Sequence, residues 1–102
     1  MLPRDTEYEG VDTDKRATDN VILGGKHWTI MRAKLAKDTL GQCHYQQRLI
    51  EISTTIRGKN ELDTTIHECL HAPFPWLREW AVNQTATEIA NVLWKLGYRK
   101  VE

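Results

Sequence analysis

The sequence predicts a small α+β fold, in which an antiparallel sheet of three to four strands packs on an H-E-x-x-H helix and a longer C-terminal helix. Short runs of β-branched and other apolar residues, punctuated by glycines, fill residues 20–53. From residue 62 onward, apolar residues recur every three or four positions, as they do on one face of a helix. Pro73 and Pro75 divide this helical part in two.

Length and charge limit the possible functions. The 102 residues suffice for one domain, and 40% hydrophobic with 27% charged residues is the balance of an ordinary globular protein. The net charge is zero, but the first 20 residues hold six acids against three bases. We expect residues 1–19 to form an acidic, flexible arm and residues 20–102 to form a single domain. The excess of three bases left for that domain is too small for a nucleic-acid partner.

The expected compartment follows from the start of the sequence and from the length of its apolar runs. None of these runs approaches the length of a membrane span, and the opening MLPRD begins no secretory signal. We therefore expect a cytoplasmic, intracellular protein without membrane attachment. Cys43 and Cys69 are then expected to be reduced thiols.

The strands are expected in the following order. Residues 21–23 (VIL), followed by Gly24 and Gly25, predict a short strand and a turn. Residues 27–35 predict a strand with Trp28 and Ile30 on its buried side, joined by Ala33 or Leu35.

Two further strands are expected after turn residues 37–41. Residues 42–46 form the first, and residues 48–53 alternate as a half-buried strand should. Residues 58–60 (GKN) break the strand pattern.

Two helices complete the predicted fold. Asn60 is a good N-cap for the first, and Asp63 favours the positive end of its dipole. Its apolar stripe is Leu62, Ile66, Cys69 and Leu70. The second helix is expected over residues 76–96, with Gly97 as its C-terminal cap. Its stripe is Val82, Ala86, Ile89, Leu93 and Leu96.

Residues 67–71 (HECLH) match the zinc-hydrolase pattern H-E-x-x-H. His67 and His71 lie about one helical turn apart, so both imidazoles can reach one metal ion. Glu68 is not a ligand in such a site, but it can accept a proton from a zinc-bound water. The plain alternative is a surface helix with two incidental histidines.

A catalytic Zn²⁺ site needs three protein ligands, and no histidine follows the motif. Extending the stripe of the second helix backward from Val82 reaches Glu79, on the core side at the helix start. If the chain folds back at the prolines, Glu79 also lies level with the two histidines. Glu88 falls on the solvent face and roughly 10 Å beyond them. The sequence therefore predicts His67, His71 and Glu79 as metal ligands.

Other residues near the motif have competing interpretations. Cys43 is a conceivable third ligand, because peptide deformylases combine H-E-x-x-H with an upstream cysteine. Asp63 could orient His67, or could simply be a helix-start acid. The four tryptophans, Trp28, Trp76, Trp80 and Trp94, are expected to serve core and hairpin packing rather than to form a substrate platform, although Trp76 and Trp80 flank the proposed site. Candidates to stabilise an oxyanion are Tyr45, Arg48, Arg78 and Tyr98, which the sequence does not rank.

Residues 26–72 resemble the core of SprT-like zinc metalloproteases. The resemblance lies in residues 40–43 (LGQC), the strand with Arg48 and residues 50–53 (IEIS), and residues 62–72 (LDTTIHECLHA). It implies a sheet whose last strand borders the cleft, His67 and His71 as ligands and Glu68 as catalytic base. SprT-like proteins supply a third histidine after the motif, whereas a glutamate on a second helix is similar to gluzincins.

The expected function is a zinc metallopeptidase that hydrolyses peptide bonds, with a zinc-activated water and Glu68 as general base. A peptide or protein is then the substrate, and residues 48–53 could align it as an added strand. The alternative is a zinc-stabilised binding or regulatory domain without catalysis. The oligomeric state is not determined by the sequence.

Overall fold

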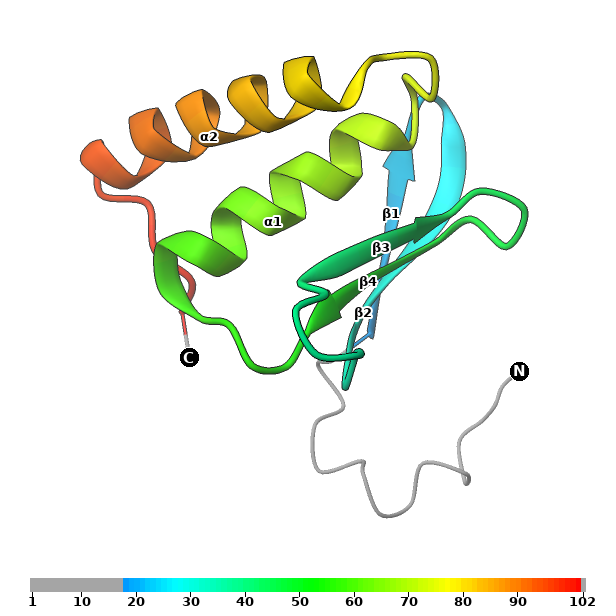
Figure 1. Ribbon diagram of the computed structural model, residues 1–102, viewed down its shortest axis with the longest axis horizontal. Helices are drawn as coiled ribbons and strands as arrows, with labels where there is room; N and C mark the ends of the chain where they lie inside the picture. Colours follow the sequence, from blue (N-terminus) through cyan, green and yellow to red (C-terminus); the bar gives the residue numbers. More distant parts are fainter. Residues whose placement is uncertain (1–17, 102) are drawn as a thin grey trace.

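The computed structural model describes residues 18–101 and confirms a small α+β fold with a longer second helix (Figure 1). The elements in chain order are β1 Thr18–Leu23, β2 Lys26–Ala33, β3 Gly41–His44, β4 Leu49–Ser53, α1 Gly58–His71 and α2 Glu79–Lys95. The first two residues of β1 come from the end of the predicted acidic arm, and residues 1–17 lie outside the described residues.

The four-stranded sheet is mixed, so the prediction of an antiparallel sheet is wrong at one pair of strands. The order is β1-β2-β4-β3, with β2 and β4 parallel and the other two pairs antiparallel. After β2, residues 34–40 cross to the far edge, and β4 returns between β2 and β3. Alternating apolar residues indicate which face of a strand is buried, but they do not indicate its neighbour or direction.

Both hairpins are closed by tight turns. Gly24 and Gly25 have φ values of 61° and 79°, as a two-residue type I′ turn requires, and Leu23 pairs with Lys26 across it. Between β3 and β4, Arg48 adopts a φ of 52° and donates its N–H to the carbonyl oxygen of Tyr45 at 3.2 Å.

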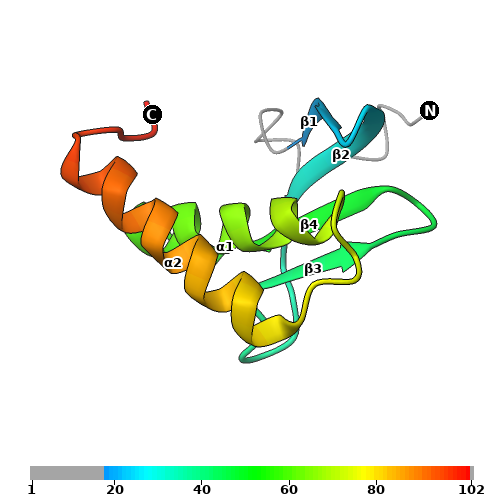
Figure 2. The same ribbon diagram turned by 90° about the horizontal axis from the view of Figure 1, so that it is seen from above.

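The core lies between one face of the sheet and α1. Its buried side chains are Trp28, Ile50, Ile52 and Ile56. Helix α1 contacts β3 and β4, and α2 runs antiparallel along α1 (Figures 1 and 2). Because α1 is in contact with both the sheet and α2, it is partly buried around most of its circumference.

Helix α1 begins earlier than its sequence predicts. Its N-cap is Arg57 rather than Asn60, which lies inside the first turn. Asp63 accepts a hydrogen bond from the Thr87 hydroxyl at 2.9 Å, and thus joins α1 to α2. The acid in the first turn of α1 is Glu61 instead.

Helix α2 begins at Glu79, three residues later than predicted, and ends at Lys95, one residue before the predicted end, with Gly97 just beyond it as expected. Gly97 has a φ of 96°, and the N–H groups of Gly97 and Tyr98 return to the carbonyls of Trp94 and Leu93, each at 3.0 Å. This is a Schellman cap. Neither helix among residues 18–101 is long and apolar enough to cross a bilayer.

The buried stripe of α2 is Val82, Ala86 and Ala90. The prediction of Ile89 on this stripe is wrong, since that side chain is exposed, as is Leu96. A spacing of four residues with small alanines lets α1 and α2 approach closely, and that contact decides which face of α2 is buried.

Candidate metal centre

The helical hairpin brings together His67 and His71, from the last turns of α1, and Glu79, the first residue of α2. One carboxylate oxygen of Glu79 lies 2.9 Å from Nε2 of His67, and the other lies 3.2 Å from Nε2 of His71. The two Nε2 atoms are 3.2 Å apart. Among residues 18–101, these three side chains form the one group of His, Cys, Asp or Glu that could hold a metal ion.

The donor set suits a single metal ion. Ligand atoms 2.0–2.2 Å from a tetrahedral ion lie about 3.3–3.6 Å from one another. The three contacts found here are close to that spacing, and the offered ligand atoms all lie within 4.8 Å of one another. The imidazoles are largely buried, whereas the Glu79 side chain is 63% exposed, so the group is open to solvent on one side.

The other candidate third ligands lie elsewhere. Glu88 is exposed on α2, where its carboxylate accepts a hydrogen bond from Gln84 at 3.1 Å. Cys43 lies on β3 and does not belong to the His67–His71–Glu79 group. Its neighbour His44 points to the opposite face and contacts Glu51 at 2.8 Å. Cys69 packs against the core, as predicted.

Glu68 is buried beside the three side chains and is 7% exposed. Burial raises the pKa of its carboxyl group; the nearby charge of His67 opposes this shift and that of Glu79 adds to it. A raised pKa makes the carboxylate a stronger base than an ordinary glutamate.

Gly41 makes room for Glu68, a role that the sequence reasoning missed. A Cβ atom at Gly41 would lie 2.9 Å from Cγ2 of Thr64 and 3.0 Å from Oε2 of Glu68. The first residue of β3 therefore approaches α1 closely at the buried carboxyl group. A glycine at the start of a strand is the only sequence signal of this contact.

Two further groups lie near Glu68. Burial raises the pKa of the Cys43 thiol to about 11, with the charge of Glu68 adding to the shift. Burial also raises the pKa of Tyr45, and the charges of Glu68 and Glu79 contribute. Of the candidates to stabilise an oxyanion, Tyr45 thus lies close to the site, whereas Tyr98 lies at the far end of α2.

The strand that could receive a peptide is β3 rather than residues 48–53. Strand β4 pairs with β2 on one side and with β3 on the other, so its backbone groups are already used. Within the described part of the chain, β3 pairs with β4 alone and forms the edge of the sheet. The prediction that the last strand, β4, borders the site is therefore wrong, because β3 lies at that edge of the sheet.

The tryptophans do not all serve the core. Trp28 is buried as predicted, and Trp94 is half-buried beneath the guanidinium of Arg99, 3.5 Å from the ring centroid. Trp76 and Trp80 are 72% and 66% exposed, so the expectation that they pack in the hairpin is wrong.

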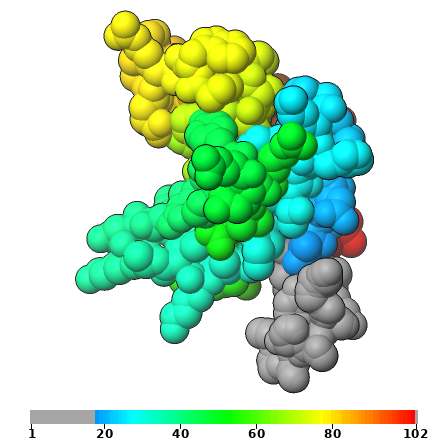
Figure 3. Space-filling view, turned by 90° about the vertical axis from the view of Figure 1, so that its right-hand side faces the viewer, coloured from blue at the N-terminus to red at the C-terminus, as the bar shows by residue number. Residues whose placement is uncertain are grey.

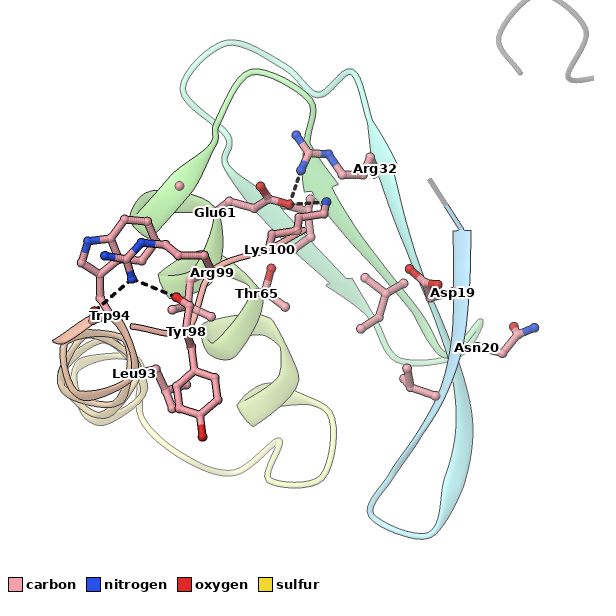
Figure 4. Close-up of a pocket in the computed structure, with 15 residues that line it drawn as sticks. Asp19, Asn20, Arg32, Glu61, Thr65, Leu93, Trp94, Tyr98, Arg99 and Lys100 are labelled. Carbon is pink, nitrogen blue, oxygen red and sulfur yellow. Dashed lines mark hydrogen bonds and ion pairs between the residues drawn. The ribbon is translucent and has the colours of Figure 1, made fainter. Parts of the chain in front are cut away.

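An open cavity of about 870 Å³ lies away from the site, between β1, β2, the first turns of α1 and the end of α2 (Figure 4). Three of its charged side chains bind one another: Arg32 and Lys100 both donate to Oε2 of Glu61, the latter at 3.0 Å. Arg99 donates to the carbonyls of Trp94 and Tyr98, each at 2.9 Å. The cavity contains none of the residues of the metal-ligand group.

Comparisons of the chain with protein-family models, with curated proteins and with solved structures find no match. The resemblance to SprT-like proteins therefore receives no support from them, and the interpretation of the site depends on its own residues.

Proposed function

We propose that this protein is a zinc-dependent metallopeptidase of a minimal zincin type, in which His67, His71 and Glu79 hold the ion. The observation that carries the proposal is the meeting of these three ligand atoms beside a buried glutamate. Imidazole and carboxylate donors accept several transition metals, and zinc is the ion that the H-E-x-x-H arrangement most often serves. A cytoplasmic location would keep the free thiols of Cys43 and Cys69 reduced.

When bound, zinc would supply Lewis acidity to polarise a peptide carbonyl and to lower the pKa of a water. Glu68 accepts a proton from the attacking water, whose oxygen bonds to the carbonyl carbon. As the C–N bond breaks, Glu68 donates that proton to the leaving amine. The raised pKa of Glu68 makes its carboxylate a stronger base for the first of these two proton transfers.

Tyr45 is the side chain that we assign to the developing oxyanion. Its hydroxyl is protonated at neutral pH, as that of an ordinary tyrosine is, and burial with nearby negative charges raises its pKa further. The free edge of β3 would align an extended substrate through backbone hydrogen bonds.

The alternative is a zinc-stabilised binding or regulatory domain. A metal held by α1 and α2 would join the two helices, and a purely structural site would serve that purpose equally well. Two features favour the enzyme: among the described residues the group offers three ligands rather than four, and the buried Glu68 would be superfluous in a structural site.

The variant Glu68→Gln distinguishes the two proposals. We expect the variant to bind one zinc per chain and to melt like the wild type, while its cleavage of a broad peptide library falls by a factor of about 10² to 10⁴. Metal content by mass spectrometry, melting and cleavage are measured together. Equal cleavage by both proteins would exclude the general-base role, and no cleavage by the wild type would favour the binding domain.

A further inference from the structure

Exposed aromatic side chains lie on both sides of Glu79 in the sequence, at the start of α2. Glu79 lies between Trp76 and Trp80 in the sequence, and both indoles are exposed to solvent. Phe74 is exposed as well, and its ring meets that of Trp76 edge-on with the centroids 5.8 Å apart. We call Phe74, Trp76 and Trp80 the aromatic corner; its segment faces the viewer at the top of Figure 3, above the β3–β4 turn.

Contact between the rings of the aromatic corner and water is unfavourable in free energy. Each indole could bury some 150–250 Å² of surface in a core, yet this small domain leaves two of them outside. Exposed apolar patches of this kind mark binding sites. The corner is also restrained, because Pro73 and Pro75 fix two φ angles and the N–H of Leu77 donates to the Phe74 carbonyl at 3.0 Å. Little conformational entropy is then lost when a ligand packs on it.

We propose that the aromatic corner is the specificity site of the enzyme, and that it selects peptides with a large apolar side chain next to the scissile bond. This inference depends on the metallopeptidase function proposed above. The solvent-open side of the metal-ligand group is formed by Glu79, so a chain that approaches from there meets the flanking indoles. A leucine or phenylalanine side chain then packs on these rings while its backbone reaches the catalytic groups.

A membrane surface fits the aromatic corner less well. Anionic headgroups attract clusters of lysine and arginine, but residues 73–80 hold one base, Arg78, and one acid, Glu79. The aromatic corner is therefore electrically balanced, as expected for a surface that recognises an uncharged side chain.

The test measures binding separately from catalysis. Zinc-loaded Glu68→Gln protein is titrated with blocked Gly/Ser decapeptides that carry one central Phe, Leu or Ala, and Kd is measured by calorimetry. We expect the Phe and Leu peptides to bind at least about tenfold more tightly than the Ala peptide. Adding Trp76→Ala and Trp80→Ala should remove this preference and leave the affinity for the Ala peptide unchanged.

Two controls accompany the titration. Tyr98→Ala removes another exposed aromatic side chain at the far end of α2 and should leave the preference intact. Trp76→Phe with Trp80→Phe should retain it, and zinc content checks that each variant is folded at the site. Equal Kd values for the three peptides, or a preference that survives the double alanine variant, would overturn the proposal.

The outcomes also distinguish this proposal from the proposed function. If apolar peptides bind at the aromatic corner but the wild type cleaves none of them, the metallopeptidase assignment fails and the binding preference stands. If the wild type cleaves peptides without regard to apolar side chains, the aromatic corner is not the specificity site although the enzyme assignment stands.

Discussion

Glu68 shows how single residues adjust a candidate site. Its carboxyl group is shielded from water, lies among the charges of His67, Glu79 and His44, and is touched by the backbone of β3 at Gly41. Burial and the charge of Glu79 raise its pKa, the charges of His67 and His44 oppose that rise, and the close approach of Gly41 limits the space for its side chain. The site thus depends on a residue without a side chain as much as on the residues that carry the chemistry.

Gly41→Ala tests this dependence. The added methyl group must displace Thr64 or Glu68, so we expect a loss of about 1–3 kcal/mol in the free energy of unfolding. Peptide cleavage should fall while zinc affinity is largely kept, because the metal ligands are not touched. Denaturant unfolding and kcat/KM measure the two effects.

The matched control for Gly41→Ala is Gln42→Ala, the next residue on β3. Its side chain points to the face of the sheet away from α1, so the change should alter stability by less than about 0.5 kcal/mol. Wild-type stability and activity in Gly41→Ala would show that Glu68 has more freedom than its contacts indicate.

At the scale of elements, the turn between α1 and α2 decides which carboxylate lies beside the histidines. The turn at residues 72–78 is tight, so the start of α2 lies level with the end of α1 (Figure 1). Glu88 lies nine residues further along α2, which corresponds to about 13 Å of helix.

Replacing each of these two glutamates by alanine is expected to show which one binds the metal. Glu79→Ala should weaken zinc binding by more than about a hundredfold, since even the loss of a group that only orients a ligand costs 10- to 100-fold. Glu88→Ala removes an exposed acid bonded to Gln84 and should bind zinc like the wild type. Competition with a chromophoric chelator gives both affinities. The reverse order would reject the hairpin register and the ligand assignment with it.

The other end of α1 is tied to β2 and to the C-terminal segment through Glu61. Burial alone would raise the pKa of Glu61, but hydrogen bonds from Lys100 and Arg32 outweigh it and hold the pKa below its usual value. A carboxyl group with a lowered pKa in the folded state stabilises the fold above its unfolded pKa. This contribution is lost as the pH falls through the folded value.

Glu61→Gln should therefore destabilise the protein by about 1–2 kcal/mol at pH 7, and the difference from the wild type should shrink below about pH 4.5. Urea unfolding of both proteins between pH 3 and pH 8 measures it. Glu88→Gln serves as the control, because its carboxylate contacts only an exposed glutamine. A difference that stays constant down to pH 3 would show that the ionised carboxylate does not supply the stability.

For the whole molecule, the small core makes the proposed metal important for stability. Among residues 18–101 the core cluster holds four buried side chains, and the two helices meet over small residues such as Ala86 and Ala90. A metal ion bound by both helices would add a cross-link that the unfolded chain lacks.

Zinc should accordingly raise the melting temperature. At a free concentration of 100 times Kd, mass action adds about 2.7 kcal/mol to the free energy of unfolding, which corresponds to about 10 °C or more for a domain of this size. Scanning calorimetry with zinc and with a chelator measures the shift, and His67→Ala should abolish it. Identical melting of the wild-type protein in both conditions would reject a metal that bridges the helices.

The sequence by itself determined the two helices, their separation at the prolines and the level at which Glu79 meets His67 and His71. These features follow from helical period, from proline geometry and from a rise of 1.5 Å per residue, all of which act over a few neighbouring residues.

Only the tertiary structure decided that β4 lies between β2 and β3, that β3 forms the edge beside the site, and that Glu68 is buried against Gly41. It also decided that Trp76 and Trp80 stay outside the core. The reason is physical. A period in the sequence reports which face of an element is apolar, whereas the neighbour that covers this face depends on contacts between residues far apart in the chain.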